Sequence, residues 1–301
     1  MRILGAMLLA AMVISPATAD ELTGTLKKIK DNNKIVLGVR DAAPPFSYLN
    51  DSEKYVGYTI DICGKIVDAL KKDLSLPNLN VQMLSVNSST RIPLMTNGTI
   101  DLECGSTTNN VERERQVAFT NSHFVTASKF ASKKSSHIKT IDDLKDKNVT
   151  SIAGTTNIVQ LIKVNTERKL GITVQPARDA ADAFLLLETD RAAAYVMDDV
   201  QLSVAIATSK DPSTYVISEE AFSPPEPYGI MLRRNDAPFK TFVDRVTAEL
   251  FPSPEMVKIY NKWFQSPVPP RGINYHYPMS AALKKALAHP TSSPDPAAYQ
   301  P

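Results

Sequence analysis

The stretch KIVLGVR at residues 34–40 is followed, after a short linking segment, by TIDICGKIVDALKKD at residues 59–73. The first stretch is a short apolar run of the length and β-branched content typical of a buried strand. Apolar residues in the second stretch recur at helical spacing on one face: Ile62, Ile66, Ala69 and Leu70. Because Pro44-Pro45 and Gly57 lie between the two stretches, we expect a loop and hairpin there.

The same alternation of strand and helix continues toward the C-terminus. Strands are predicted at 79–86 and 99–104, with a helix near 90–97 between them. A second unit repeats the pattern, with strands at 148–153, 172–177, 192–198 and 214–218 and helices near 157–169, 179–190 and 199–208. Such alternation builds mostly parallel sheets, so the predicted fold class is α/β.

From about residue 221 the pattern of the first unit resumes without a linker of its own. The predicted elements are a strand in PYGIMLRR (227–234) and amphipathic helices at 237–250 and 255–265. The tail from Ser266 is rich in Pro and is predicted to wrap the surface, with one short helix at 280–287. We therefore expect a discontinuous first lobe, residues 20–121 plus 222–301, and a second lobe at 122–221.

Length and composition exclude several classes of protein. A chain of 301 residues is long enough for about two domains of ordinary size. Lys and Arg number 34 against 32 Asp and Glu, a balance unlike the basic excess of nucleic-acid binders. Two Cys and four His without metal-ligand spacing predict neither a disulfide scaffold nor a metal site, and no cofactor is expected.

The first nineteen residues have the layout of an export signal. Arg2 supplies a positive charge, an apolar run follows to Ile14, and Ala17-Thr18-Ala19 is a small-residue cleavage pattern. The apolar run is too short to span a bilayer comfortably, and no later stretch reaches about 18 apolar residues. We therefore expect a signal peptide at 1–19 and a mature protein that diffuses freely in the periplasm of a Gram-negative bacterium.

Polar side chains follow the predicted strands, at the edge where α/β sheets bind ligands. The candidate ligand-binding residues are Arg40, Ser88, Arg91, Ser106, Thr108, Arg113, Thr156 and Asp198. Each of the three guanidinium groups can form two parallel hydrogen bonds with a carboxylate, and the one acidic residue among them can pair with an ammonium group. The set therefore implies a ligand with two carboxylates and one amine.

Structural roles compete with this interpretation. An Arg after a strand is often a surface ion pair, and Ser88 or Thr156 could simply cap a helix. Asp199 is expected to cap the helix that follows it. The joint occurrence of such residues at equivalent strand ends favours a binding site.

The run ECGSTTNNVER at residues 103–113 resembles the pattern of glutamate/aspartate-binding proteins of bacterial amino-acid ABC importers, solute-binding protein family 3. So do Arg91-Ile92-Pro93-Leu94, Met197-Asp198-Asp199, and Thr140-Ile141-Asp142-Asp143-Leu144 with Gly154-Thr155-Thr156. The similarity covers roughly residues 25–290. It implies the type II periplasmic-binding-protein fold, in which two α/β lobes joined by two crossing strands close on a ligand. It also implies delivery of the ligand to a membrane permease, and we expect the protein to be a monomer.

The resemblance assigns a role to each candidate residue by matching position. Arg113, Ser106 and Thr108 would hold the α-carboxylate, and Asp198 the α-ammonium group. Arg40, Ser88 and Arg91 would face the side-chain carboxylate. Thr156 would close from the second lobe.

One departure leaves the ligand open. Close glutamate/aspartate binders resemble Asp-His-Gly-Asp where this chain has Asp179-Ala180-Ala181-Asp182. Loss of the His donor near a buried carboxylate would cost about 1–3 kcal/mol if nothing replaces it. Glutamine, asparagine or a related dicarboxylic compound therefore remains an alternative ligand.

Two other functions share the predicted fold. A periplasmic enzyme resembling the cyclohexadienyl dehydratases would need a proton donor, for which Glu103 is the nearest candidate, although its position allows it to face solvent. His123 is expected to be structural. A ligand-presenting partner of a chemoreceptor or sensor kinase would share the binding step.

The two cysteines are predicted to form a disulfide. Cys63 lies on the first predicted helix and Cys104 at the end of the third strand, in a βαβαβ unit whose helix packs on the sheet. An exported protein enters an oxidising compartment, where adjacent thiols pair. Two separate buried thiols are the alternative.

Overall fold

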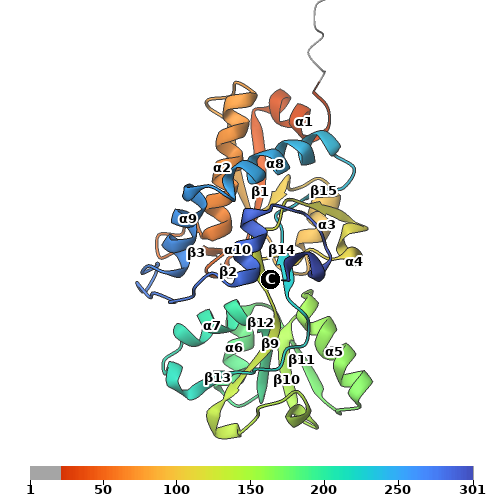
Figure 1. The fold of residues 1–301 in the computed structure, drawn as a ribbon, viewed down its shortest axis with the longest axis vertical. Coiled ribbons are helices and arrows are strands. Elements are labelled where there is room, and N and C mark those ends of the chain that lie inside the picture. The colour runs from red at the N-terminus through yellow and green to blue at the C-terminus, as the bar shows by residue number, and fades with distance from the viewer. Residues whose placement is uncertain (1–21, 301) are drawn as a thin grey trace, which may run out of the picture.

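The computed structural model describes residues 22–300, and these residues form two lobes stacked along the long axis of the molecule (Figure 1). Each lobe is built on its own five-stranded sheet, as predicted for two α/β units. The predicted signal peptide, residues 1–19, lies outside the described residues. Within residues 22–300, no helix is long and apolar enough to cross a membrane.

The first lobe combines elements from both ends of the chain. Its sheet has the order β5 (Asn80–Ser85), β1 (Lys34–Val39), β6 (Leu102–Glu103), β15 (Met231–Arg233) and β7 (Val117–Phe119). Strand β1 pairs in parallel with β5 and β6, whereas β15 is antiparallel to β6 and β7. The late strand β15 therefore lies inside the sheet that the N-terminal strands begin.

Helices and a small hairpin surround this sheet. The helices are α1 (Gly24–Asn32), α2 (Tyr58–Asp73), α3 (Arg91–Thr96), α4 (Val111–Glu114), α8 (Ala237–Leu250) and α9 (Pro254–Phe264). The hairpin predicted around Pro44-Pro45 has three strands, β2 (Ala42–Ala43), β3 (Ser47–Leu49) and β4 (Tyr55–Val56). Ile62, Ile66 and Leu70 of α2 are fully buried against the sheet, which confirms the predicted apolar face.

The second lobe repeats the design with one strand that sequence patterns missed. Its sheet has the order β11 (Thr173–Ala177), β10 (Asn148–Ile152), β12 (Ala194–Asp198), β9 (Ser128–Lys133) and β13 (Tyr215–Ile217). Its helices are α5 (Thr156–Arg168), α6 (Ala180–Glu188) and α7 (Asp199–Ala207). Strand β9 is antiparallel to β12 and β13, so each lobe has one antiparallel strand in an otherwise parallel sheet.

Two paired strands connect the lobes. β8 (Phe124–Thr126) and β14 (Glu226–Tyr228) run antiparallel, with Tyr228 opposite Phe124. The prediction of a single strand in PYGIMLRR is wrong, because this segment is divided between the two strands β14 and β15. The break falls at Gly229, where a Cβ would lie 3.0 Å from the Cβ of Phe119. We propose that the lobe boundaries lie close to this pair, as the predicted limits at 121/122 and 221/222 require.

An aromatic cluster packs around the connecting strands. The Phe46 ring makes edge contacts with Tyr58, Phe124 and Tyr228, and Phe124 stacks on Phe264. All five side chains are essentially inaccessible to solvent. The cluster therefore joins the hairpin, α2, α9 and both connecting strands into one core, and it fixes the first-lobe side of the connection.

The C-terminal tail follows the surface, as predicted, and then returns to the first connecting strand. Its helix α10 (Ala281–Ala288) contacts β8, and a short 3₁₀ helix at Pro296–Tyr299 ends with a fully buried Tyr299. Other 3₁₀ turns lie at Lys134–Ser136, Asp142–Leu144 and Pro212–Thr214.

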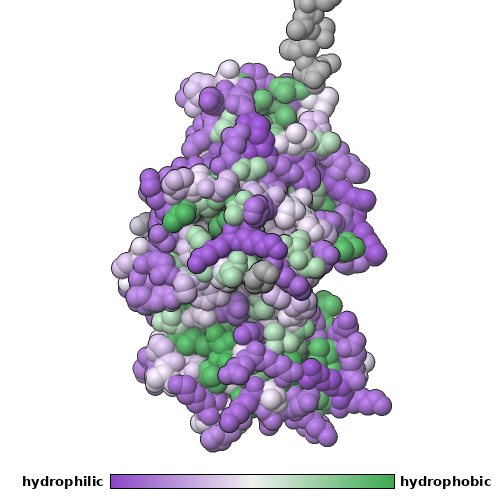
Figure 2. Space-filling view, viewed as in Figure 1, coloured by the Kyte–Doolittle hydropathy of each residue, from purple (hydrophilic) through white to green (hydrophobic). Residues whose placement is uncertain are grey.

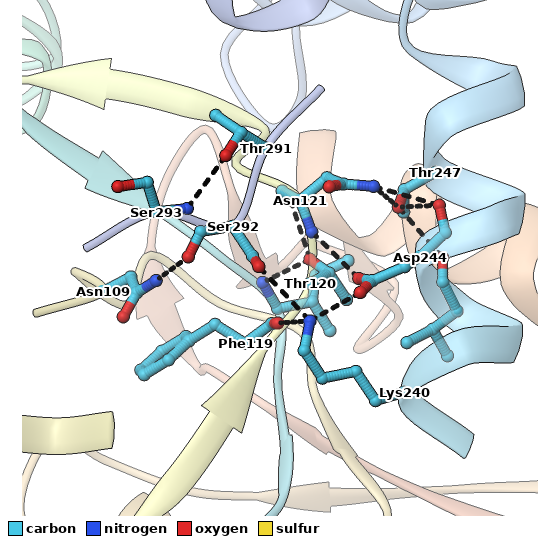
Figure 3. Close-up of polar contacts among 12 residues, drawn as sticks. Asn109, Phe119, Thr120, Asn121, Lys240, Asp244, Thr247, Thr291, Ser292 and Ser293 are labelled. Atoms are coloured by element: carbon cyan, nitrogen blue, oxygen red, sulfur yellow. Dashed lines mark hydrogen bonds and ion pairs between the residues drawn. The ribbon is translucent and has the colours of Figure 1, made fainter. Parts of the chain in front are cut away.

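Figure 3 shows how polar contacts hold the tail in place. Asn109 donates its Nδ2 to the carbonyl oxygen of Ser292 at 2.9 Å, and Lys240 of α8 contacts the Oγ of the same serine at 3.3 Å. Lys240 also pairs with Asp244, which accepts from the backbone N–H of Asn121. The tail, α8 and the segment leading into β8 are therefore linked by one hydrogen-bonded network.

The predicted disulfide between Cys63 and Cys104 is present, with a Cα–Cα distance of 6.3 Å. Both residues are fully buried. The bond links α2 to the segment directly after β6. It therefore anchors the start of the Gly105-Ser106 loop to the helix beneath it.

Candidate functional site

The carboxyl ends of strands from both sheets face each other between the lobes. One cavity at this junction is lined by all eight candidate residues: Arg40, Ser88, Arg91, Ser106, Thr108, Arg113, Thr156 and Asp198. The other lining residues are Ala42, Ala43, Ile152, Thr155, Asn157, Ala180, Met197 and Gln201. The tertiary structure therefore brings together residues that are spread over some 160 positions of the chain.

The cavity is narrow in this arrangement of the lobes. Its volume of about 10 Å³ is roughly the room that one water molecule needs. An amino acid is several times larger than water. A ligand of that size can therefore enter only when the lobes move apart, which is the motion expected of a two-lobed hinge protein.

Arg40 and Ser88 form the first polar pair of the cavity. Arg40 follows β1 directly, and its Nη2 donates to Ser88 Oγ at 3.1 Å. Burial, together with the neighbouring charge of Arg91, lowers the pKa of Arg40 to about 10. The side chain therefore carries its charge at neutral pH in a place where that charge is poorly solvated, which favours an anionic ligand.

Arg91 is the first residue of α3 and is held by a side-chain relay. Its Nη1 donates to Thr107 Oγ1 at 2.6 Å, and Thr107 Oγ1 in turn donates to Glu103 Oε2 at 2.6 Å. Arg91 and Glu103 are buried, and burial is the main cause that lowers the pKa of Arg91. Glu103 does not face solvent, as the sequence had allowed; it lies behind Arg91 and Thr107, outside the cavity wall.

Arg113 lies on α4, on the other side of the same loop. Its Nη1 donates to the carbonyl oxygen of Thr108 at 2.8 Å, and its Nη2 approaches the carbonyl oxygen of Gly154 in the second lobe at 3.4 Å. Burial, with a smaller contribution from Arg91, lowers the pKa of Arg113 to about 9. Three buried guanidinium groups therefore line one small cavity, and among the described residues none of them forms an ion pair with an exposed carboxylate.

Asp198 ends β12 and is the acid of the cavity wall. It accepts a hydrogen bond from Asn157 Nδ2 at 2.9 Å and another, short one from the hydroxyl of Tyr228. Burial raises its pKa, while these two donors favour the ionised form. Both neighbouring groups donate hydrogen bonds to Asp198, which is the pattern of an ionised carboxylate that can still bind a cation.

The structure separates capping residues from cavity residues. Thr155, not Thr156, caps α5 by accepting from the backbone N–H of Ile158. Thr156 Oγ1 instead lies 3.4 Å from Thr108 Oγ1 across the cavity. The prediction that Asp199 caps α7 is wrong, because the helix begins at Asp199 itself and Asp198 occupies the N-cap position without a side-chain capping bond. Asp199 instead accepts from the backbone N–H of Val200 within the first turn, where a negative charge stabilises the helix.

Three polar residues of the wall lie outside the predicted set: Thr155, which caps α5, and two residues whose contacts sequence reasoning missed. Asn157 orients Asp198, and Gln201 of α7 donates its Nε2 to Ser106 Oγ at 3.1 Å across the lobes. Both are buried. Each lies in the first turn of a helix, one to three residues beyond a predicted site residue, and this spacing is the signal that could have found them.

A larger groove of about 860 Å³ adjoins the cavity and shares Ala42, Ala43, Ala180 and Gln201 with it. On the face seen in Figure 2, hydrophobic side chains gather on the second lobe below the junction. Phe184, Leu185 and Val204 from α6 and α7 line the groove, and its basic residues are Lys210 and Arg271. The buried arginines and Asp198 line the narrow cavity instead, which makes that cavity the candidate ligand site.

His123 takes no part in the cavity. Its ring lies between those of Tyr58 and Tyr228, is inaccessible to solvent, and has neither ring nitrogen hydrogen-bonded. Burial lowers the pKa of His123 to about 3, so the ring is neutral at ordinary pH. In the described part of the chain, no group of three or more His, Cys, Asp or Glu residues is placed to hold a metal ion.

Comparison with known proteins places the chain among binding proteins. The family model described as bacterial extracellular solute-binding proteins, family 3, matches residues 35–266. An L-glutamate/L-aspartate-binding protein of Pseudomonas aeruginosa is 47% identical over 292 residues, covering 96% of each chain. A glutamate/aspartate import solute-binding protein of Escherichia coli is 41% identical over 289 residues, covering 95% of each chain.

Solved structures of the same architecture are also similar. A mutant of ArgBP from T. maritima superimposes with a TM-score of 0.72 at 27% identity, covering 80% of this chain and 100% of that one. The alignment therefore extends over the whole of that chain.

Proposed function

The chain belongs to the bacterial extracellular solute-binding proteins of family 3, with the predicted type II periplasmic-binding-protein fold, and on that premise we propose that it binds an acidic amino acid, L-glutamate or L-aspartate, for import. The observation that carries the proposal is the composition of one cavity. Three buried guanidinium groups and one buried carboxylate line it together. A ligand with two carboxylates and one ammonium group complements that set.

The contacts suggest how the cavity divides between the ends of the ligand. Arg113 lies beside Thr108 and Ser106 on one loop, where the α-carboxylate would bind. Arg40, Ser88 and Arg91 form the other basic group, which suits the side-chain carboxylate. Asp198 would accept the ammonium group, and Thr156 would close over the ligand from the second lobe.

Neutral polar amino acids remain the competing ligands because of Ala180. This residue lines the cavity where the adjoining groove begins, and its methyl group donates no hydrogen bond. The buried guanidinium groups nevertheless supply donors to a side-chain carboxylate without a histidine at this position. Desolvated arginines beside a neutral amide would lose the charge pairing that offsets their burial, so we favour the acidic ligands.

Binding explains the site better than catalysis. The curated relatives are named as binding proteins, and Glu103, the acid that an enzyme would need, does not line the cavity. We propose that the chain acts as an exported, monomeric carrier that delivers its ligand to the permease of an ABC importer. A chemoreceptor or sensor kinase would read the same closed lobes.

A thermal-shift screen of the purified mature protein tests the proposal. The protein is unfolded and refolded to remove carried ligand, then heated with single amino acids, glutarate and prephenate. Glutamate or aspartate at 100 times its Kd is expected to stabilise the native state by about 2.7 kcal/mol. If glutamine or asparagine raises the melting temperature and neither acidic amino acid does, the ligand assignment is wrong. Conversion of prephenate to an aromatic product would favour the enzyme.

A further inference from the structure

Glu103 is a buried acid that the proposed ligand contacts leave unexplained. Its side chain is completely inaccessible, and Oε2 accepts from Thr107 while Oε1 has no hydrogen-bond partner. The unpartnered Oε1 lies 3.9 Å from Arg91 Nη1. A buried carboxylate is costly unless charges or donors compensate it, so its presence here requires a reason.

The backbone is shaped to admit this carboxylate. A Cβ on Gly105 would lie 2.2 Å from Glu103 Oε1, so only a glycine leaves room for the side chain to fold back toward the arginines. The Cγ of Arg40 lies 3.2 Å from the same hypothetical Cβ, so Arg40 also packs close to this glycine. Glu103 is therefore placed behind the wall that Arg40 and Arg91 present to the cavity.

Its negative charge acts on all three arginines of the site. The field of Glu103 raises the pKa of Arg40, Arg91 and Arg113, against the lowering by burial. Three positive guanidinium groups and the single negative charge of Asp198 would together give the cavity a net charge of +2. Glu103 reduces this to one, the complement of an amino acid that has two carboxylates and one ammonium group.

Glu226 is the other acid near Arg113. Burial raises its pKa to about 7, so it carries only part of a charge at neutral pH. It accepts from Gln160 of the second lobe rather than from an arginine. Glu226 raises the pKa of Arg113 more than Glu103 does, but it is a named influence on that arginine only, whereas Glu103 raises the pKa of all three arginines.

We propose that Glu103 is a specificity-determining residue, which sets the charge of the cavity so that it prefers acidic amino acids to dicarboxylates without an amine. This inference rests on the proposed function. Glu103 touches no ligand: its charge sets the preference between ligands, while its hydrogen bond from Thr107 only helps to position Arg91.

The test compares L-glutamate with glutarate, which is the same molecule without the amine, by isothermal titration calorimetry. In Glu103→Gln the amide still accepts from Thr107 but the charge is gone. The ratio of the glutarate Kd to the glutamate Kd is expected to fall at least about tenfold relative to wild type. Thr107→Val is the matched control: it breaks the relay, keeps both charges, and should leave the ratio within about threefold of wild type, a difference worth less than 1 kcal/mol.

A second variant with one positive charge removed, Arg40→Gln, provides the test if Glu103→Gln alone does not fold. Arg40→Gln removes one guanidinium group, and both ligands lose that contact equally because both have the side-chain carboxylate. Adding Glu103→Gln to Arg40→Gln is expected to return the ratio to the wild-type value. An unchanged ratio on removing Glu103, or an equal change in Thr107→Val, would overturn the inference. Failure of the wild-type protein to bind glutamate or aspartate would instead overturn the proposed function.

Discussion

Arg91 and Arg113 occupy the same cavity but are held by different partners. Arg113 is bonded to the Thr108 carbonyl oxygen, whereas Arg91 is bonded through Thr107 to Glu103. In the proposed complex Arg113 faces a carboxylate that every amino acid has, and Arg91 faces one that only acidic amino acids have. The two arginines should therefore differ in what their loss does to binding.

Replacing each arginine by alanine tests this difference. Arg113→Ala is expected to abolish binding of glutamate and glutamine alike, whereas Arg91→Ala should weaken glutamate much more than glutamine. Calorimetric titration of both ligands measures the two Kd values for each variant. Equal losses for both ligands in both variants would contradict the assignment.

Arg91→Ala should also affect the fold. Removing one partner of a buried pair leaves Glu103 uncompensated, which costs about 3–5 kcal/mol. Urea unfolding of the ligand-free variant therefore accompanies the binding measurement, so that weak binding by a folded protein is distinguished from loss of the folded protein.

His123 gives the fold a defined dependence on pH. Its pKa is about 3 in the native protein, below the ordinary value of 6.5, because burial disfavours the charged ring. Between these values the unfolded chain binds the proton and the native protein does not. Stability is therefore complete above pH 6.5 and falls as the pH drops, by about 2 kcal/mol at pH 5 from this residue.

His123→Phe should remove this loss, because phenylalanine fills the aromatic site between Tyr58 and Tyr228 and does not titrate. The free energy of unfolding in urea, measured at pH 7.5 and pH 5, should differ less in the variant than in wild type. His289→Gln, a change at an exposed histidine, serves as the control and should keep the wild-type difference. An unaltered difference in His123→Phe would contradict a buried, neutral ring.

At the scale of elements, the disulfide joins α2 to the loop that carries Ser106 and Thr108. The two cysteines are 41 positions apart, so the bond closes a loop whose restriction in the unfolded chain is worth roughly 3–4 kcal/mol. Neither cysteine lines the cavity. The bond is therefore expected to support stability more than ligand affinity.

The double variant Cys63→Ala/Cys104→Ala tests this expectation. Its free energy of unfolding should be lower than that of wild type by about 3–4 kcal/mol. The glutamate Kd of the folded variant should change less than about threefold, a difference below 1 kcal/mol. Reduced wild-type protein is the matched comparison and should show the same loss. Two free thiols in denatured, unreduced wild-type protein would contradict the bond.

At the scale of the molecule, few direct contacts hold the lobes together across the cavity. Gln201 reaches Ser106 at 3.1 Å, while the contacts of Thr108 with Thr156, of Arg113 with Gly154 and of Ser89 with the carbonyl oxygen of Ala153 are all at 3.4 Å. Arg271 of the tail adds a contact to the carbonyl oxygen of Thr208 at 2.7 Å. Because these contacts are few, we expect the additional contacts made by a ligand that touches both lobes to determine how closely the lobes approach.

Small-angle X-ray scattering tests this expectation. The radius of gyration of refolded wild-type protein should fall when saturating glutamate is added, because ligand bridges Arg113 of the first lobe and Asp198 of the second. Arg113→Ala under the same conditions should show no fall. A radius that does not change when calorimetry shows the site to be occupied would mean that binding occurs without closure.

Local patterns along the chain were sufficient for most elements and for the chemistry of the site. Apolar periodicity predicted α2 and α8 to within a residue at their ends, and polar residues after strands predicted eight members of the cavity wall. These features depend on neighbours in sequence: a helix needs one apolar face, and a strand end in a parallel sheet points to the ligand edge.

Tertiary structure decided the rest, because pairing between distant segments leaves no local pattern. The short strands β8 and β9 were missed, and PYGIMLRR was divided between two sheets where the chain crosses from one lobe to the other. The side on which Glu103 lies likewise depended on its packing against Gly105 and Arg91 rather than on its alternation with Leu102 and Cys104. The residues alone determined that three arginines and one aspartate follow strands of an α/β fold; only the folded chain brought those charges into one cavity and placed a buried carboxylate behind them.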